Sequence, residues 1–215
     1  MASDIDVNIL RKLFLEELET KPVSYIISKW MFECTPFVFN TIEDWLLWKE
    51  KLSTLLKVDS RAITITGSAC VGFSLNPEKN FRDFTDQSDI DVAIISSHYF
   101  DISWHYLRNI GPERFKLNQI QKNSLHDHVN RLIYWGTIAT DKILEILPFG
   151  KPWIESLAEM ADVEPTVGRD INLRIYKDFD SLRAYHSNNL NNIKNNVLLR
   201  KIGGVSDEII LKHDA

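Results

Sequence analysis

The sequence predicts an α+β protein, a small mixed β-sheet with flanking helices and a helical C-terminal part. Apolar residues recur at helical spacing over most of the chain, whereas three short segments alternate apolar and polar residues in twos, as strands do. The 215 residues, 44% of them hydrophobic, suffice for one full core. We expect one compact unit made of an N-terminal helical segment (1–57), an α+β core with a helical insertion (58–178) and a C-terminal helical segment (179–215).

The N-terminal segment is predicted to be helical throughout. Residues 4–20 repeat apolar side chains at helical spacing, and residues 23–33 are expected to form a second, short helix. Thr41, with Asp44 three residues later, resembles a capping box. The amphipathic helix that begins there is expected to run through Leu56, with its aromatic and leucine side chains in the core.

The rest of the chain mixes strands and helices. The alternating, β-branched segments predict strands over 61–66, 89–95 and 170–176. Helical patterns occupy 98–110, about 113–147, 152–161 and 179–202.

Composition and charge exclude several classes of protein. The net charge of −5 disfavours a protein that coats duplex nucleic acid, although it leaves room for local phosphate binding. No apolar run approaches the roughly 18 residues of a membrane span, and the acidic N-terminus lacks the apolar run of a secretory signal, so a cytoplasmic protein without membrane contact is expected. Two cysteines cannot build a disulfide framework.

Gly67 and Ser68 form the first feature with chemical meaning, because they follow a predicted strand and precede a predicted helix. Glycine permits a sharp turn and a close approach of a ligand to the main chain. A serine hydroxyl and the free N–H groups of a helix start are suited to an anion. On its own, such a junction is usually a simple helix cap.

Asp89 and Asp91 form the second feature. Residues two apart on a strand point to the same face, so the two carboxylates project side by side. Their repulsion is relieved by a divalent cation, and Mg²⁺ binds through one or two carboxylates plus substrate phosphates. An isolated Asp-x-Asp is most often a solvated strand start, but one that follows a Gly-Ser turn is what metal-assisted nucleotidyl transfer requires.

The stretch Ile65-Thr66-Gly67-Ser68-Ala69-Cys70-Val71-Gly72, followed by Ser88-Asp89-Ile90-Asp91-Val92, resembles the signature of the DNA polymerase beta-like nucleotidyltransferase superfamily. The resemblance covers residues 61–96 well and 165–180 loosely. It implies a nucleotidyltransferase-type sheet, with Gly67 and Ser68 binding the phosphates of an NTP. It also implies that Asp89 and Asp91 hold two Mg²⁺ ions, or Mn²⁺, and that a third carboxylate on a later strand completes the site.

The third carboxylate is not obvious from the sequence. Asp170 is the best candidate, because it lies on the polar face of the strand predicted over 170–176. Asp178 is second and Glu145 third. Arg174 shares the face of Asp170, where it would neutralise a phosphate or pair with one of the two acids.

The segment 76–87 looks longer than in compact relatives, which makes it a candidate lid or substrate loop. Its Lys79 and Arg82 are candidates for phosphate contact, with a solvated loop as the alternative. Lys79 joins Gly67, Ser68 and Arg174 as a predicted nucleotide-binding residue.

These features predict a Mg²⁺-dependent nucleotidyltransferase that moves a nucleoside monophosphate from an NTP or dNTP to a hydroxyl acceptor and releases pyrophosphate. The acceptor stays open between a nucleotide or oligonucleotide end, a small molecule and a partner protein. The resemblance suggests a bacterial toxin–antitoxin or anti-phage setting. The alternative is a catalytically impaired, nucleotide-binding regulatory or partner-binding protein of the same fold, and it is motivated by the uncertain third carboxylate.

Overall fold

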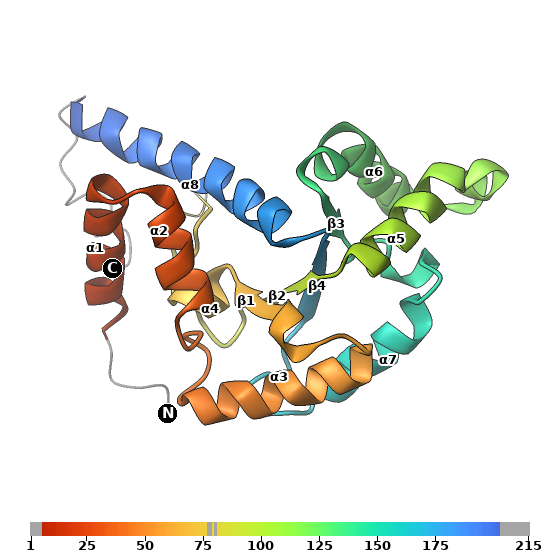
Figure 1. Ribbon diagram of the computed structural model, residues 1–215, viewed down its shortest axis with the longest axis horizontal. Coiled ribbons are helices and arrows are strands. Elements are labelled where there is room, and N and C mark those ends of the chain that lie inside the picture. Colours follow the sequence, from red (N-terminus) through yellow and green to blue (C-terminus); the bar gives the residue numbers. More distant parts are fainter. Residues whose placement is uncertain (1–5, 77–78, 80, 203–215) are drawn as a thin grey trace.

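A four-stranded mixed sheet lies at the centre of the computed structural model, which describes residues 6–76, 79 and 81–202 (Figure 1). The strands are β1 (Ile63–Thr66), β2 (Ile90–Ile95), β3 (Thr137–Ala139) and β4 (Ile171–Tyr176), in the spatial order β1-β2-β4-β3. The central pair β2 and β4 is parallel, and the two outer pairs are antiparallel. The predicted α+β class is confirmed.

Helices precede, interrupt and follow the strands. They are α1 (Val7–Thr20), α2 (Val23–Ile27), α3 (Ile42–Leu56), α4 (Ser68–Val71), α5 (Ser97–Asn109), α6 (Gln119–Asp127), α7 (Gly150–Met160) and α8 (Phe179–Ile202). The π-helical turn η1 (Ser28–Phe32) continues α2. None of the helices in the described ranges combines the length and the hydropathy that a bilayer crossing demands.

The predicted cap of α3 is present: Thr41 Oγ1 accepts a hydrogen bond from the backbone N–H of Asp44 at 3.1 Å. The prediction of a mainly helical stretch over 113–147 is wrong in its second half. That stretch contains α6 and short helical turns, but it also contains the edge strand β3, which pairs with β4. Three residues are too few for an alternating pattern to stand out from the helical sequence around them.

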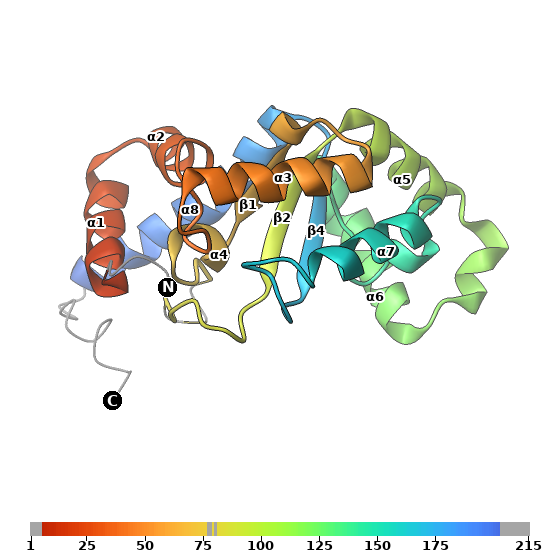
Figure 2. The same cartoon turned by 90° about the horizontal axis from the view of Figure 1, so that it is seen from below.

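One face of the sheet is aliphatic. Alternation assigns nine side chains to it, of which Ile171 is half-buried and the others are buried: Ile63, Ile65, Ile90, Val92, Ile94, Ile138, Leu173 and Ile175. Helices α3 and α7 lie on one side of the sheet, and α2 and α8 lie on the other (Figures 1 and 2). The main hydrophobic core joins the strands to helices from both ends of the chain.

The opposite face of the sheet is polar. The strand register places Thr66, Asp91, Asn172 and Arg174 on it. Near β1 this face is closed by η1, because Thr64 Oγ1 donates a hydrogen bond to the Met31 carbonyl at 3.0 Å. Helix α8 runs across the rest. A polar sheet face beneath a polar, asparagine-rich helix does not pack dry, so a cavity remains between them.

Candidate active site

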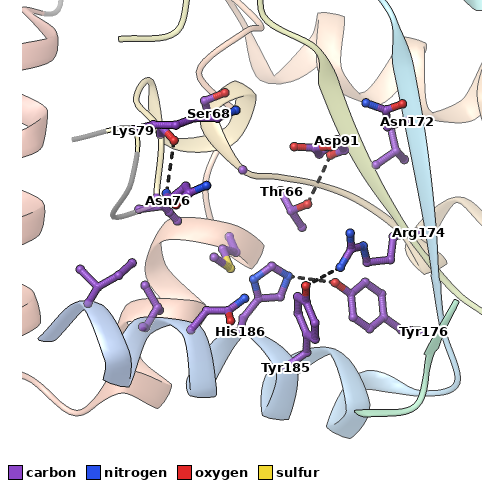
Figure 3. A pocket seen from close by; sticks show the side chains of 18 of the residues that line it. Thr66, Ser68, Asn76, Lys79, Asp91, Asn172, Arg174, Tyr176, Tyr185 and His186 are labelled. Atoms are coloured by element: carbon purple, nitrogen blue, oxygen red, sulfur yellow. Dashed lines mark hydrogen bonds between the residues drawn. The ribbon is translucent and has the colours of Figure 1, made fainter. Parts of the chain in front are cut away.

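A cavity of about 630 Å³ lies between the polar face of the sheet and α8. Its wall includes five of the predicted site residues, Gly67, Ser68, Lys79, Asp91 and Arg174, which come from separate parts of the chain. In the close view, Asp91 lies between the Ser68 side of the cavity and the Arg174 side, with His186 and Tyr185 projecting from α8 (Figure 3). The structure therefore brings most of the predicted residues into one space.

Gly67 and Asp91 are in direct contact. Thr66 pairs with Asp91 across β1 and β2, so the turn after β1 meets the acid on β2. The backbone of Gly67 has φ +66° and ψ −153°, a conformation that is essentially restricted to glycine. A Cβ at this position would lie 2.7 Å from Asp91 Oδ2. The absence of a side chain at Gly67 thus allows the carboxylate to lie against the turn.

The segment after Gly67 is held by the N-terminal part of the chain. Ser68 begins the four-residue helix α4. The N–H groups of Phe37 and Val38 donate to the carbonyls of Cys70 and Ala69 at 2.9 and 3.0 Å. These bonds hold the segment in which Ser68 lines the cavity.

Asp91 has an unusual electrostatic environment. Part of its surface is open to the cavity, but the protein atoms on the other sides desolvate it and raise its pKa, and repulsion from Asp89 adds to the rise. The positive charges of Arg174 and Lys79 oppose this effect. Among the residues that the structure describes, none donates a hydrogen bond to the carboxylate. A carboxylate in this state gains from a bound cation.

Asp89 lies immediately before β2, is exposed and does not contribute to the cavity wall. It acts on Asp91 electrostatically, because its negative charge raises the pKa of Asp91. Asp170 occupies the equivalent place before β4, since its carbonyl accepts a hydrogen bond from Ile90 N at 2.8 Å. Asp170 is also exposed and outside the cavity wall.

The structure does not assemble the predicted three-carboxylate set. Over residues 6–76, 79 and 81–202, no group of three His, Cys, Asp or Glu side chains is arranged to hold a metal. Asp178 instead caps α8, where its Oδ1 accepts from Ser181 N at 2.7 Å. Hydrogen bonding from the Ser181 side chain, and secondarily from its backbone, lowers the pKa of Asp178. Glu145 is exposed on a short helical turn and does not line the cavity. The β4 residue that pairs with Asp91 is Asn172, an amide.

The contacts between β4 and α8 at the site were not predicted from the sequence. Arg174 Nη1 donates to the Tyr185 hydroxyl at 2.5 Å, and the guanidinium lies 5.1 Å from the centre of that ring. The hydroxyl of Tyr176 lies 3.3 Å from His186 Nε2. Burial, and secondarily the charge of Arg174, lower the pKa of His186 to about 4, so its imidazole is neutral at pH 7. These contacts join β4 to α8, and no local sequence pattern signals them.

Arg169 was also missed. Its Nη1 donates to the carbonyls of Thr85 and Ser88 at 2.7 and 3.1 Å, and its Nη2 donates to Asp86 Oδ1 at 3.0 Å. The guanidinium lies 4.9 Å from the centre of the Phe84 ring. Arg169 thereby fixes the loop that leads into Asp89.

The segment 76–87 is only partly a wall of the cavity. Asn76 and Lys79 line it. The predicted phosphate contact Arg82 lies outside the wall, and its carbonyl accepts a hydrogen bond from Ser74 N at 2.8 Å. Residues 77, 78 and 80 of the candidate lid lie outside the described residues.

Comparison of the chain with protein-family models, with curated proteins and with solved structures gives no match.

Proposed function

We propose that this protein is a Mg²⁺-dependent nucleotidyltransferase that transfers a nucleoside monophosphate from an NTP or dNTP to a hydroxyl group, with release of pyrophosphate. The observation that carries the proposal is the contact between Asp91 and Gly67 at the edge of the cavity. It unites the two halves of a motif that are 24 residues apart in the sequence. The proximity of the two halves supports the proposal.

The charges around the cavity support a triphosphate as ligand. Ser68 offers a hydroxyl, and Lys79 and Arg174 offer positive charge from opposite sides of Asp91. Hydroxyl and cationic donors of this kind bind phosphate oxygens, and arginine does so with a planar fork. Positioning and charge stabilisation are the main contributions that a protein makes to phosphoryl and nucleotidyl transfer.

The residues fit a divalent cation of the magnesium type. Asp91 is exposed towards the cavity, is partly desolvated by its protein neighbours and has no hydrogen-bond donor among the described residues, and the charge of Asp89 repels it. Mg²⁺ commonly binds through one or two carboxylates together with substrate phosphates. When bound, such an ion would neutralise phosphate charge and lower the pKa of the attacking hydroxyl.

The experiment is a transfer assay with α-labelled NTPs and dNTPs and with Mg²⁺ or Mn²⁺. Acceptors are an oligonucleotide 3′ end, a mixture of small hydroxylated molecules and a cell extract as a source of protein acceptors. We expect label transfer and pyrophosphate release by the wild type, and a loss of at least about 100-fold in the Asp89→Ala/Asp91→Ala double variant, in line with removal of an electrostatic catalytic group.

The matched control is Glu155→Ala/Asp162→Ala. It removes the same formal charge from exposed positions outside the cavity, and we expect wild-type activity. Equal activity in the two double variants would contradict the proposal. So would a wild type that neither transfers label nor binds Mn²⁺ and a non-hydrolysable triphosphate in calorimetry.

One observation favours a second candidate, a nucleotide-binding protein with impaired catalysis. The residue that pairs with Asp91 on β4 is Asn172 rather than a carboxylate. Triphosphate binding that depends on Asp91, without turnover on any acceptor, would favour this candidate over the enzyme.

A further inference from the structure

Strand β4 places an amide and a guanidinium beside the proposed metal ligand. Asp91 pairs with Asn172, and Ala93 pairs with Arg174, in the parallel register of β2 and β4. Side chains two apart on a strand share a face, so Asn172 and Arg174 point to the same side as Asp91. Both line the cavity. The resemblance led us to expect a third carboxylate on a later strand, with Asp170 at the start of this one as the best candidate.

Arg174 is fixed in place and keeps its charge for a ligand. The Tyr185 hydroxyl accepts a hydrogen bond from its Nη1 at 2.5 Å, and the same ring lies beneath the guanidinium. Arg174 forms no ion pair with a described residue. Its positive charge acts on Asp91 and partly offsets the rise in the pKa of that carboxyl group. Burying a guanidinium whose hydrogen-bond partner is a neutral hydroxyl destabilises the protein, and a bound anion would offset that loss of free energy.

Asp141 also lines the cavity, but it does not take the missing place. It follows β3, and β4 separates β3 from β2 in the sheet. Its carboxylate forms an exposed ion pair with Lys142 Nζ at 3.6 Å, and its charge is the weakest of those that act on Asp91. Asp89 is therefore the stronger acidic influence on Asp91 and Asp141 the weaker one, Arg174 and Lys79 act on it with positive charge, and the β4 residue that pairs with it is an amide.

We propose that the site holds a single divalent cation, carried by Asp89 and Asp91, and that the Arg174 guanidinium supplies the second positive charge against the triphosphate. This inference rests on the proposed function and replaces the expected two-ion site. Two carboxylates balance one divalent ion. A second ion at this position would have Asn172 as its new protein ligand and would lie beside a fixed positive charge, which opposes its binding.

The decisive measurement is the stoichiometry of Mn²⁺ on the full-length protein, determined by electron paramagnetic resonance in the presence of a non-hydrolysable triphosphate. We expect one bound Mn²⁺ per chain and a spectrum without spin coupling. Two bound ions in the wild type would overturn the inference while leaving the proposed function intact. Failure to bind both Mn²⁺ and triphosphate would instead contradict the proposed function itself.

The role of Arg174 is tested separately with Arg174→Gln, a substitution that removes the charge and keeps a hydrogen-bond donor for Tyr185. We expect triphosphate affinity to fall at least 10-fold while the affinity for Mn²⁺ alone does not fall, and Arg174→Lys to recover part of the loss. The control is Arg183→Gln on α8, whose side chain donates to Ser28 Oγ at 3.0 Å and does not line the cavity. Unchanged triphosphate affinity in Arg174→Gln would overturn the assignment.

A gain-of-site variant completes the experiment. In Asn172→Asp/Arg174→Gln the β4 positions again offer a carboxylate and no cation, and we expect a second Mn²⁺ with spin coupling between the ions. Tryptophan fluorescence checks that the variant is folded. A folded variant that still binds one ion would show that Asn172 and Arg174 do not set the stoichiometry.

Discussion

Two features of the structure require glycine at position 67. The backbone conformation there suits only glycine, and a Cβ would lie too close to Asp91 Oδ2, at 2.7 Å. We expect Gly67→Ala to cost about 1–3 kcal/mol of unfolding free energy through backbone strain. It should also displace the Asp91 carboxylate, and so abolish Mn²⁺ binding and transfer. Denaturant unfolding and Mn²⁺ titration of the folded variant measure the two effects.

Gly168→Ala is the matched control for that prediction. Gly168 has a φ of +69°, but a Cβ there would meet nothing within 4 Å. The substitution should cost about 1 kcal/mol and leave Mn²⁺ affinity unchanged. If both alanine variants bind Mn²⁺ like the wild type, the contact between Gly67 and Asp91 is not needed for the site.

His186 links the stability of the protein to pH. Its pKa is about 4 in the folded chain and 6.5 in an ordinary environment. Its contribution to stability is complete above pH 6.5 and is lost as the pH falls towards 4, because only the unfolded chain takes up the proton. We expect His186→Gln to flatten the fall in unfolding free energy over this range, by at most about 1.4 kcal/mol per pH unit.

The control for this effect is the exposed His126→Gln, which should keep the wild-type slope. Part of the slope should persist in His186→Gln as well, because burial also lowers the pKa of His128. Identical slopes for His186→Gln and the wild type, measured by urea unfolding at several pH values, would show that folding does not lower the pKa of His186.

The difference between residues found from the sequence and residues missed follows from the range of their contacts. Gly67 and Asp91 are signalled by a turn and a strand with local patterns, and the antiparallel pairing of β1 with β2 brings them together. Tyr185 and Arg174 meet only because α8 docks over β4. That docking depends on the whole core, and no spacing in the sequence encodes it.

At the scale of elements, strands were predictable where alternation runs for six residues, as in β2 and β4, and unpredictable for the three residues of β3. Because β3 was not predicted, Asp141, which follows that strand and lines the cavity, was not predicted as a residue of the site either. The third carboxylate was sought on β4 by analogy, and the register of β4 places Asn172 there instead.

The loop that enters β2 depends on one side chain of the segment that enters β4. Arg169 binds two loop carbonyls and Asp86, and Ser88 directly precedes Asp89. We expect Arg169→Gln to weaken Mn²⁺ binding about 10-fold or more, a typical effect of losing an outer partner of a metal ligand. Faster hydrogen exchange over 85–89 should accompany the loss.

A lysine at position 169 should not restore this function, because it lacks the planar fork that reaches several acceptors at once. The control is Arg82→Gln, which removes an equal charge from a neighbouring exposed side chain outside the cavity. Equal Mn²⁺ affinities for Arg169→Gln and Arg82→Gln would indicate that the loop is positioned by other contacts.

At the scale of the whole molecule, the cavity is built from segments that also build the core. Met31 and Leu190 line the cavity, and both are buried. The N-terminal helices, the sheet and α8 share one hydrophobic core cluster. The proposed ligand should therefore stabilise the described fold as a unit rather than only the edge of the cavity.

This coupling predicts a single shifted unfolding transition. At a triphosphate concentration of 100 Kd with Mg²⁺ present, binding adds about 2.7 kcal/mol to the unfolding free energy. For a chain of this size that corresponds to a rise in Tm of roughly 5–11 °C. Asp89→Asn/Asp91→Asn should show no such rise, whereas Glu155→Gln/Asp162→Gln should show all of it. Calorimetry distinguishes the outcomes. A single unfolding transition that shifts to higher temperature supports a site built into the common core. A second transition that does not shift would mean that α8 or the N-terminal helices unfold independently of the cavity.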